Sequence, residues 1–211
     1  MTNAIYKAET GKVFWMMIAG LIIGVIQAIM ALVAVAGGIA AIATGGEHGV
    51  GAAGGAGIVL VLLALVNIAL KVMLYLSYGK LAKDFGDNAD GKALGNIKLA
   101  ALFDLINVGI GLISILLLPL AIVLGIIALV VSIVAYIFYL MGFSALKNSS
   151  TFPGAAGAST VFVAYILILV GAVLGIIPVL NIIGGIAGLV GLIMLLVGWA
   201  KIKNAPLPEA A

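Results

Sequence analysis

The sequence predicts an all-α membrane protein, a polytopic bundle of six transmembrane helices arranged as three hairpins. Three observations support this prediction. Of the 211 residues, 65% are hydrophobic and only 8% are charged, whereas a soluble domain has about 25% charged residues. Several apolar runs exceed the ~20 residues that a helix needs to cross a bilayer. The lysines lie between these runs and not within them, except for Lys71. We therefore expect a single transmembrane domain, residues 1–211.

The helix boundaries follow from the uncharged runs. The first run, residues 13–46, is longer than one straight span requires, so this helix is expected to tilt, to project beyond the bilayer or to break at the glycine pair 37–38. Because glycine disfavours a helix, residues 45–57 are expected to form a flexible loop. The run 105–146 is also too long for one span, and Pro119 is its best helix breaker. The predicted helices cover residues 13–44, 58–81, 93–117, 120–146, 160–177 and 181–200.

The positions of the lysines predict the orientation of these helices. Lysines occur in the N-terminal segment, in and around the polar loop 84–92, after the fourth helix and in the C-terminal tail. All of these places lie on one side of the predicted bundle, and the charged content of the other side is Glu47. Cytoplasmic loops of membrane proteins are enriched in lysine and arginine, so both termini are expected to face the cytoplasm.

The aromatic residues gather near the same lysine-rich helix ends, which predicts an aromatic belt at the cytoplasmic interface. Three of these ends are alike: YGKLAK at 78–83, FSALKN at 143–148 and WAKIKN at 199–204. They indicate either a repeated hairpin or a common need for aromatic and lysine anchors. With these ends and the segment LGIIPVLNIIGGIAGLVGLIMLLVGW at 174–199, the chain resembles Gly/Ala-rich, multi-span prokaryotic membrane proteins of unknown function. The resemblance implies the cytoplasmic (inner) membrane of a prokaryote.

Two charged residues are expected inside the apolar spans. Lys71 and Asp104 fall at the same depth when the second and third helices are folded back on each other near Asp87. A charge at the centre of a span costs ~2.5–3.5 kcal/mol, and a mutual pair recovers part of that cost. The pair is therefore either structural, with Lys71 free to extend toward the interface, or part of a transport or partner-binding site.

Uncharged polar residues also occur within the spans. The same folding places Asn67 level with Asn107, and Gln27 lies in the first helix. Such side chains most often form hydrogen bonds between helices, and coordination of a solute is the alternative. Small residues recur at a spacing that permits close helix contact, so helices one, five and six are expected to pack tightly, within the chain or between copies. These glycines are Gly20, Gly24, Gly171, Gly175, Gly184 and Gly188.

The composition argues against several classes of function. All ten basic residues are lysines, and the absence of arginine makes a nucleotide or nucleic-acid site improbable, since arginine is the usual bidentate phosphate ligand. With no cysteine and a single histidine, His48, no metal centre and no cofactor are expected. GFSA at 142–145 is similar to the GxSx motif of rhomboid proteases, but the helix-borne histidine of that family is missing. Intramembrane aspartyl proteases need two aspartates within spans, and only Asp104 is present.

Three functional hypotheses remain, and none of them is enzymatic. The leading hypothesis is a structural or accessory subunit that packs with copies of itself or within a larger membrane complex. The second is a small ion, proton or solute channel or transporter that uses Lys71 and Asp104. The third is a lipid-binding or bilayer-shaping protein whose lysines are attracted to anionic headgroups.

Overall fold

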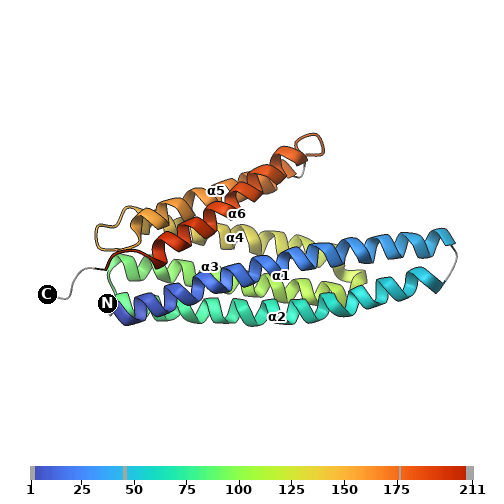
Figure 1. Ribbon diagram of the computed structural model, residues 1–211, viewed down its shortest axis with the longest axis horizontal. Coiled ribbons are helices and arrows are strands. Elements are labelled where there is room, and N and C mark those ends of the chain that lie inside the picture. Colours follow the sequence, from blue (N-terminus) through green and yellow to red (C-terminus); the bar gives the residue numbers. More distant parts are fainter. Residues whose placement is uncertain (1–2, 45–46, 176, 208–211) are drawn as a thin grey trace.

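The computed structural model describes residues 3–44, 47–175 and 177–207, and it is almost entirely helical (Figure 1). In these ranges the six helices are α1 Asn3–Thr44, α2 Glu47–Phe85, α3 Ala89–Leu116, α4 Ala121–Lys147, α5 Ala155–Gly175 and α6 Asn181–Lys203. A short 3-10 helix, η1, covers Leu118–Leu120. All six α-helices are long and apolar enough to cross a membrane, which confirms the all-α class and is compatible with an integral membrane protein.

The surface of the helices agrees with a lipid environment. Large apolar side chains are exposed on every helix, and Ile122 and Ile182 retain 82% and 78% of their accessible surface. A contiguous apolar surface of this extent would be an aggregation hazard in water. In a bilayer the same surface meets lipid chains, while the helical hydrogen bonds satisfy the backbone.

The first two helices are longer than predicted. α1 begins at Asn3 and not at residue 13, because Tyr6, Thr10 and Val13 form a buried stripe at helical spacing. It also continues through the glycine pair 37–38, so the predicted break is wrong. The predicted loop 45–57 is wrong from Glu47 onward, where α2 begins, and its first two residues lie outside the described part of the chain. The low helix propensity of glycine therefore does not decide the backbone conformation in these segments.

The turn between α3 and α4 is where the sequence placed it. Pro119 lies in η1, and the backbone N–H of Leu117 bonds to the carbonyl of Ile113 as α3 ends. Proline has no N–H and its ring excludes a continuous helix, so the chain reverses at this point. The end of α1 and the start of α6 are as predicted, and, apart from the starts of α1 and α2, the other helix ends differ from the predicted bounds by one to five residues.

Neighbouring helices in the chain are neighbours in space. The most extensive contacts join α5 with α6, α1 with α2 and α3 with α4, followed by α2 with α3, and smaller ones join α4 with α5 and α1 with α6. Both termini lie at one end of the molecule (Figure 1). From that end, α5 and α6 diverge from the other four helices (Figure 1).

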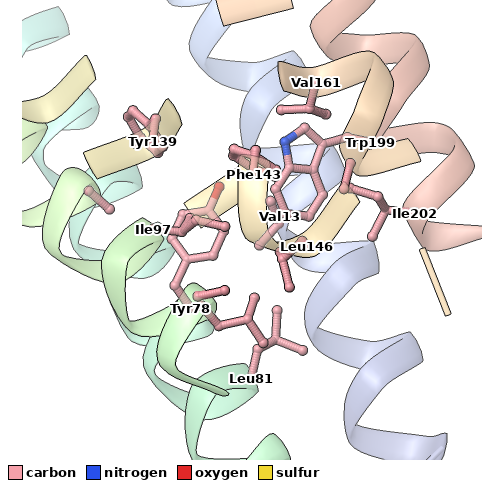
Figure 2. Close-up of a cluster of buried hydrophobic side chains, with 14 of the residues drawn as sticks. Val13, Tyr78, Leu81, Ile97, Tyr139, Phe143, Leu146, Val161, Trp199 and Ile202 are labelled. Atoms are coloured by element: carbon pink, nitrogen blue, oxygen red, sulfur yellow. The ribbon is translucent and has the colours of Figure 1, made fainter. Parts of the chain in front are cut away.

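Many of the aromatic residues form a core and not a belt at the interface. Phe143 and Trp199 are fully or almost fully buried, and their rings meet edge to face at 5.9 Å (Figure 2). The ring of Tyr78 also packs against Trp199, with centroids 5.8 Å apart. Trp15 is a true surface aromatic, 62% exposed. The buried rings therefore pack against each other and do not face lipid, contrary to the predicted belt, whereas the other aromatics keep part of their surface exposed.

Close packing at the predicted glycines is found within the chain between α5 and α6 but not for α1, where packing between copies stays a prediction. A Cβ on Gly171 would lie 2.7 Å from the backbone of both Gly184 and Gly188, so these helices touch through their backbones. Gly175 lies at the end of the same contact, because a Cβ on Gly184 would lie 2.6 Å from its nitrogen. In contrast, a Cβ on Gly20 or Gly24 would meet no atom within 4 Å.

Candidate functional site

The predicted proximity of Lys71 and Asp104 is confirmed. Lys71 Nζ lies 3.0 Å from Asp104 Oδ2, so α2 and α3 are joined by an ion pair within their spans. Each side chain keeps about a quarter of its accessible surface, 27% and 25%. The tight turn between the helices sets this register: Gly86 adopts a left-handed φ of 73°, and Asn88 caps α3 by accepting the N–H of Gly91 at 2.8 Å.

A third residue, Tyr139 of α4, completes the polar group. Its hydroxyl donates to Asp104 Oδ2 at 3.0 Å, and its ring stacks on that of Tyr165 with centroids 4.5 Å apart. The carboxylate therefore accepts one charged and one neutral hydrogen bond. Sequence reasoning missed Tyr139, because it assigned the aromatics near the helix ends to the lipid interface.

The ion pair lies in the wall of a cavity of about 490 Å³. The cavity is lined by residues of all six helices, most of them from α1, α2 and α6. Its polar lining consists of Asn67, Lys71, Asp104, Tyr139 and Tyr165. Its apolar lining is formed by Met16, Met17, Gly20, Leu21, Gly24, Val25, Ala28, Leu70, Leu74, Leu192, Leu195 and Leu196. A mostly apolar cavity with a few polar groups on one wall is typical of small-molecule sites.

The aromatic core closes this cavity toward the lysine-rich end. Tyr78 lies one helical turn beyond Leu74, and Phe143 lies one turn beyond Tyr139. Trp199 follows the α6 leucines in the same direction. All three rings are buried. The cavity is therefore a pocket with a closed floor. Its lining includes residues of α1 and α6, two helices that diverge from the lysine-rich end (Figure 1).

The remaining polar residues predicted for the site are divided between two places. Asn67 lines the cavity one turn before Lys71. Asn107 is outside the lining, and its amide donates to Ser132 of α4 at 2.9 Å, as expected of a hydrogen bond between helices. The sequence predicts Asn67 and Asn107 at the same depth in neighbouring helices, but they do not line the same cavity. Gln27 is also outside the lining.

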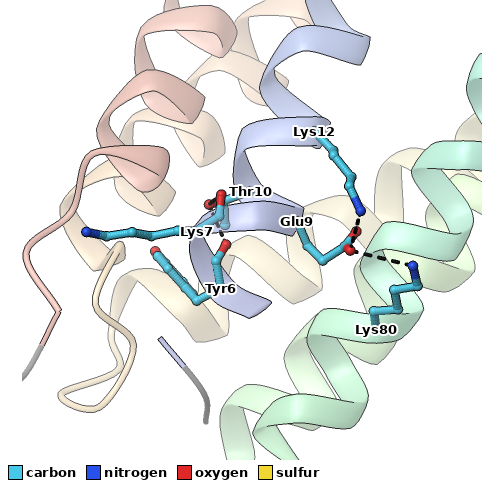
Figure 3. Close-up of polar contacts among 6 residues, drawn as sticks. All are labelled: Tyr6, Lys7, Glu9, Thr10, Lys12 and Lys80. Carbon is cyan, nitrogen blue, oxygen red and sulfur yellow. Dashed lines mark hydrogen bonds and ion pairs between the residues drawn. The ribbon is translucent and has the colours of Figure 1, made fainter. Parts of the chain in front are cut away.

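A second charged cluster lies at the lysine-rich end. Glu9 of α1 is 95% buried and pairs with Lys12 at 2.7 Å and Lys80 at 3.6 Å (Figure 3). Beside it, the hydroxyl of Thr10 donates to the carbonyl of Tyr6 within the same helix. The cluster ties the start of α1 to the end of α2. Because its carboxylate is paired with two of the protein's own lysines, we assign it a structural role.

Comparisons with protein-family models, with curated proteins and with solved structures found no match to this chain. The candidate site therefore rests on its own geometry. That geometry is an ion pair with an added tyrosine in the wall of a closed-floor, mainly apolar cavity.

Proposed function

We propose that this chain is a non-enzymatic integral membrane protein that takes up a small amphiphilic molecule from the bilayer into the cavity beside Lys71 and Asp104. The observation that supports this proposal is the cavity itself, whose volume of about 490 Å³ falls within the ~300–1,000 Å³ of small-molecule sites. Its apolar walls match the tail of an amphiphile, and its single polar wall matches the head.

The proposed topology is three hairpins with both termini in the cytoplasm of a prokaryote. The lysine distribution supports this orientation through the positive-inside rule. With this topology the floor of the cavity faces the cytoplasm. The divergence of α1 and α6 then opens the cavity toward the bilayer and the outer side, which is the direction from which a lipid-soluble molecule arrives.

Filling the cavity tests the proposal. Gly24 lines it and has open space where a Cβ would be, so Gly24→Leu adds bulk at an open position of the lining. We expect photolabelling of the cavity residues by a diazirine-bearing single-chain alcohol, in nanodiscs, to fall severalfold in Gly24→Leu. Gly125→Leu in α4 is the matched control, because Gly125 is exposed, also has open space and is outside the lining. Equal labelling of the same peptides in both variants would refute the proposal.

A conduit for ions, protons or a solute is the second candidate, and the intramembrane ion pair is the observation that favours it. The closed aromatic floor means that such a conduit needs a further conformation. Flux into liposomes that is unchanged by Asp104→Asn and by Lys71→Met would remove this candidate.

Membership in a homo-oligomer or a larger complex is the third candidate. A Cβ on Gly20 or Gly24 of α1 would meet no atom of this chain within 4 Å, and small residues permit close contact with a second helix. The same open space lines the cavity, so a ligand and a partner helix would compete for it. Finding only monomers after mild extraction of the native membrane would count against this candidate.

A further inference from the structure

The polar wall of the cavity has no net formal charge. Its charged groups are the ammonium of Lys71 and the carboxylate of Asp104, which are bonded to each other. The other polar groups of the lining, on Asn67, Tyr139 and Tyr165, are ordinarily neutral. A bound molecule therefore meets a dipole and not a single charge.

The wall keeps unused hydrogen-bonding capacity next to that dipole. Both bonds to the carboxylate of Asp104 reach Oδ2, so Oδ1 can still accept a bond. Lys71 uses one of the three donors of its ammonium on Asp104. Asn67 adds an amide one turn away on α2. A hydroxyl group, which donates and accepts, can bond to Oδ1 and to the ammonium at once without disturbing the pair.

A charged head would have to break the pair. An anion would compete with Asp104 for Lys71, and a cation would compete with Lys71 for Asp104. In either case one charge of the wall loses its partner in a poorly solvated place, which is strongly unfavourable. The wall therefore discriminates against both signs of charge.

The size of the cavity limits the apolar part of the ligand. A volume of about 490 Å³ holds roughly sixteen groups the size of a water molecule, at ~30 Å³ each. That is the size of one medium-length alkyl chain with a small head. Most of the apolar lining comes from α1 and α6, so we place the tail between these two helices.

We infer that the cavity binds an uncharged, single-chain amphiphile whose head bears a hydroxyl group, with that hydroxyl bonded to Lys71 and Asp104 and the tail between α1 and α6. This inference rests on the proposed function and specifies its ligand.

Three probes that share one tail test the head group: tetradecanol, tetradecyl sulfate and tetradecylammonium. Each competes with the photoreactive alcohol for the protein in phosphatidylcholine nanodiscs. We expect tetradecanol to halve the labelling at a mole fraction about tenfold lower than either charged probe. A tenfold difference in affinity is about the most that one hydrogen bond contributes. An equal or better competition by a charged probe would overturn the inference.

Variants that remove one charge of the pair test the head-group preference. A pair with a purely structural role would leave that preference unchanged. Asp104→Asn leaves the cation of Lys71, and we expect the preference to change to tetradecyl sulfate. Lys71→Met leaves the carboxylate, and the preference should change to tetradecylammonium. The double variant Lys71→Met/Asp104→Asn removes both charges. Because no unpaired charge remains, it should fold even where a single variant fails. It should also reject both charged probes, as the unsubstituted protein does. A uniform loss for all three probes in every variant that folds would contradict the inference.

The controls separate this inference from the proposed function. Ser114→Ala changes a hydroxyl that bonds to its own helix at Ile110 and should leave all three competitions unchanged. If Gly24→Leu abolishes labelling but the three heads compete equally, the cavity stands and the neutral head is wrong. If Gly24→Leu has no effect on labelling, the proposed function fails and the inference fails with it.

Discussion

Two glycines that are adjacent in the sequence have opposite surroundings. Gly184 is buried against α5, and a Cβ there would lie 2.6 Å from the nitrogen of Gly175 and 2.7 Å from the carbonyl oxygen of Gly171. Gly185 is exposed, and a Cβ there would meet no atom within 4 Å. The same methyl group is thus forbidden at one position and free at the next, because successive residues of a helix point in directions about 100° apart.

This difference predicts opposite effects of one substitution. Gly184→Ala should destabilise the protein by about 1–3 kcal/mol, since α5 and α6 must move apart. Gly185→Ala, its matched control, should be neutral or should stabilise the helix by up to about 1 kcal/mol through helix propensity. Equilibrium unfolding in mixed micelles measures both. Equal stabilities of the two variants would show that the backbone contact between α5 and α6 is absent.

At the scale of elements, the junction of α1 with α6 positions one edge of the cavity. The hydroxyl of Tyr6 donates to the carbonyl of Ile202 at 2.9 Å. This carbonyl lies in the last turn of α6 and also accepts the backbone N–H of Ala205 at 3.3 Å. Nearby, the ammonium of Lys203 lies 4.8 Å from the ring centroid of Phe14 and 5.4 Å from that of Trp15. These contacts hold the two helices together at the end from which they diverge.

Removing the hydroxyl should therefore loosen the end of α6. Tyr6→Phe is expected to cost about 1 kcal/mol and to speed hydrogen exchange of the amides at 200–205 several times. Tyr75→Phe is the control, because the ring of Tyr75 remains available to the Lys98 ammonium that lies 4.9 Å from its centroid. Unchanged exchange at the end of α6 in Tyr6→Phe would argue against the junction.

At the scale of the whole molecule, charge asymmetry determines how the bundle is expected to sit in the bilayer. The lysine-rich end contains both termini and the loop at 148–154 (Figure 1). The opposite end contains the turn between α5 and α6, where Val179 is 86% exposed. Basic residues remain on the cytoplasmic side during insertion, so these two ends should be on opposite sides of the membrane.

The chain has no cysteine, so single cysteines can report this orientation directly. An impermeant maleimide should label Ser150→Cys, at an exposed position of the lysine-rich end, in inverted vesicles and not in intact cells. Val179→Cys should show the reverse. Labelling of both from the same side would exclude the proposed topology.

The sequence predicts features that depend on residues close together in the chain better than features that depend on residues far apart in it. Composition and the length of apolar runs are enough for the membrane class and for six helices, because lipid requires every spanning backbone to satisfy its own hydrogen bonds. Pro119 marks its turn for an equally local reason. The Lys71–Asp104 pair is also predictable, since one short turn joins its two helices and their register follows from counting residues.

The other features depend on how each helix is rotated about its axis and tilted against distant helices. This rotation buries Tyr139 beside Asp104, directs Asn107 to Ser132 and leaves Gly24 facing open space. Apolar residues surround most of each helix, so the sequence has no polar stripe to mark the inner face. Local propensity and counting determined the membrane class, the six helices and the ion pair. Packing between segments far apart in the chain decided the aromatic core, the glycine contacts and the cavity, because the shape of a space between helices depends on all of its walls at once.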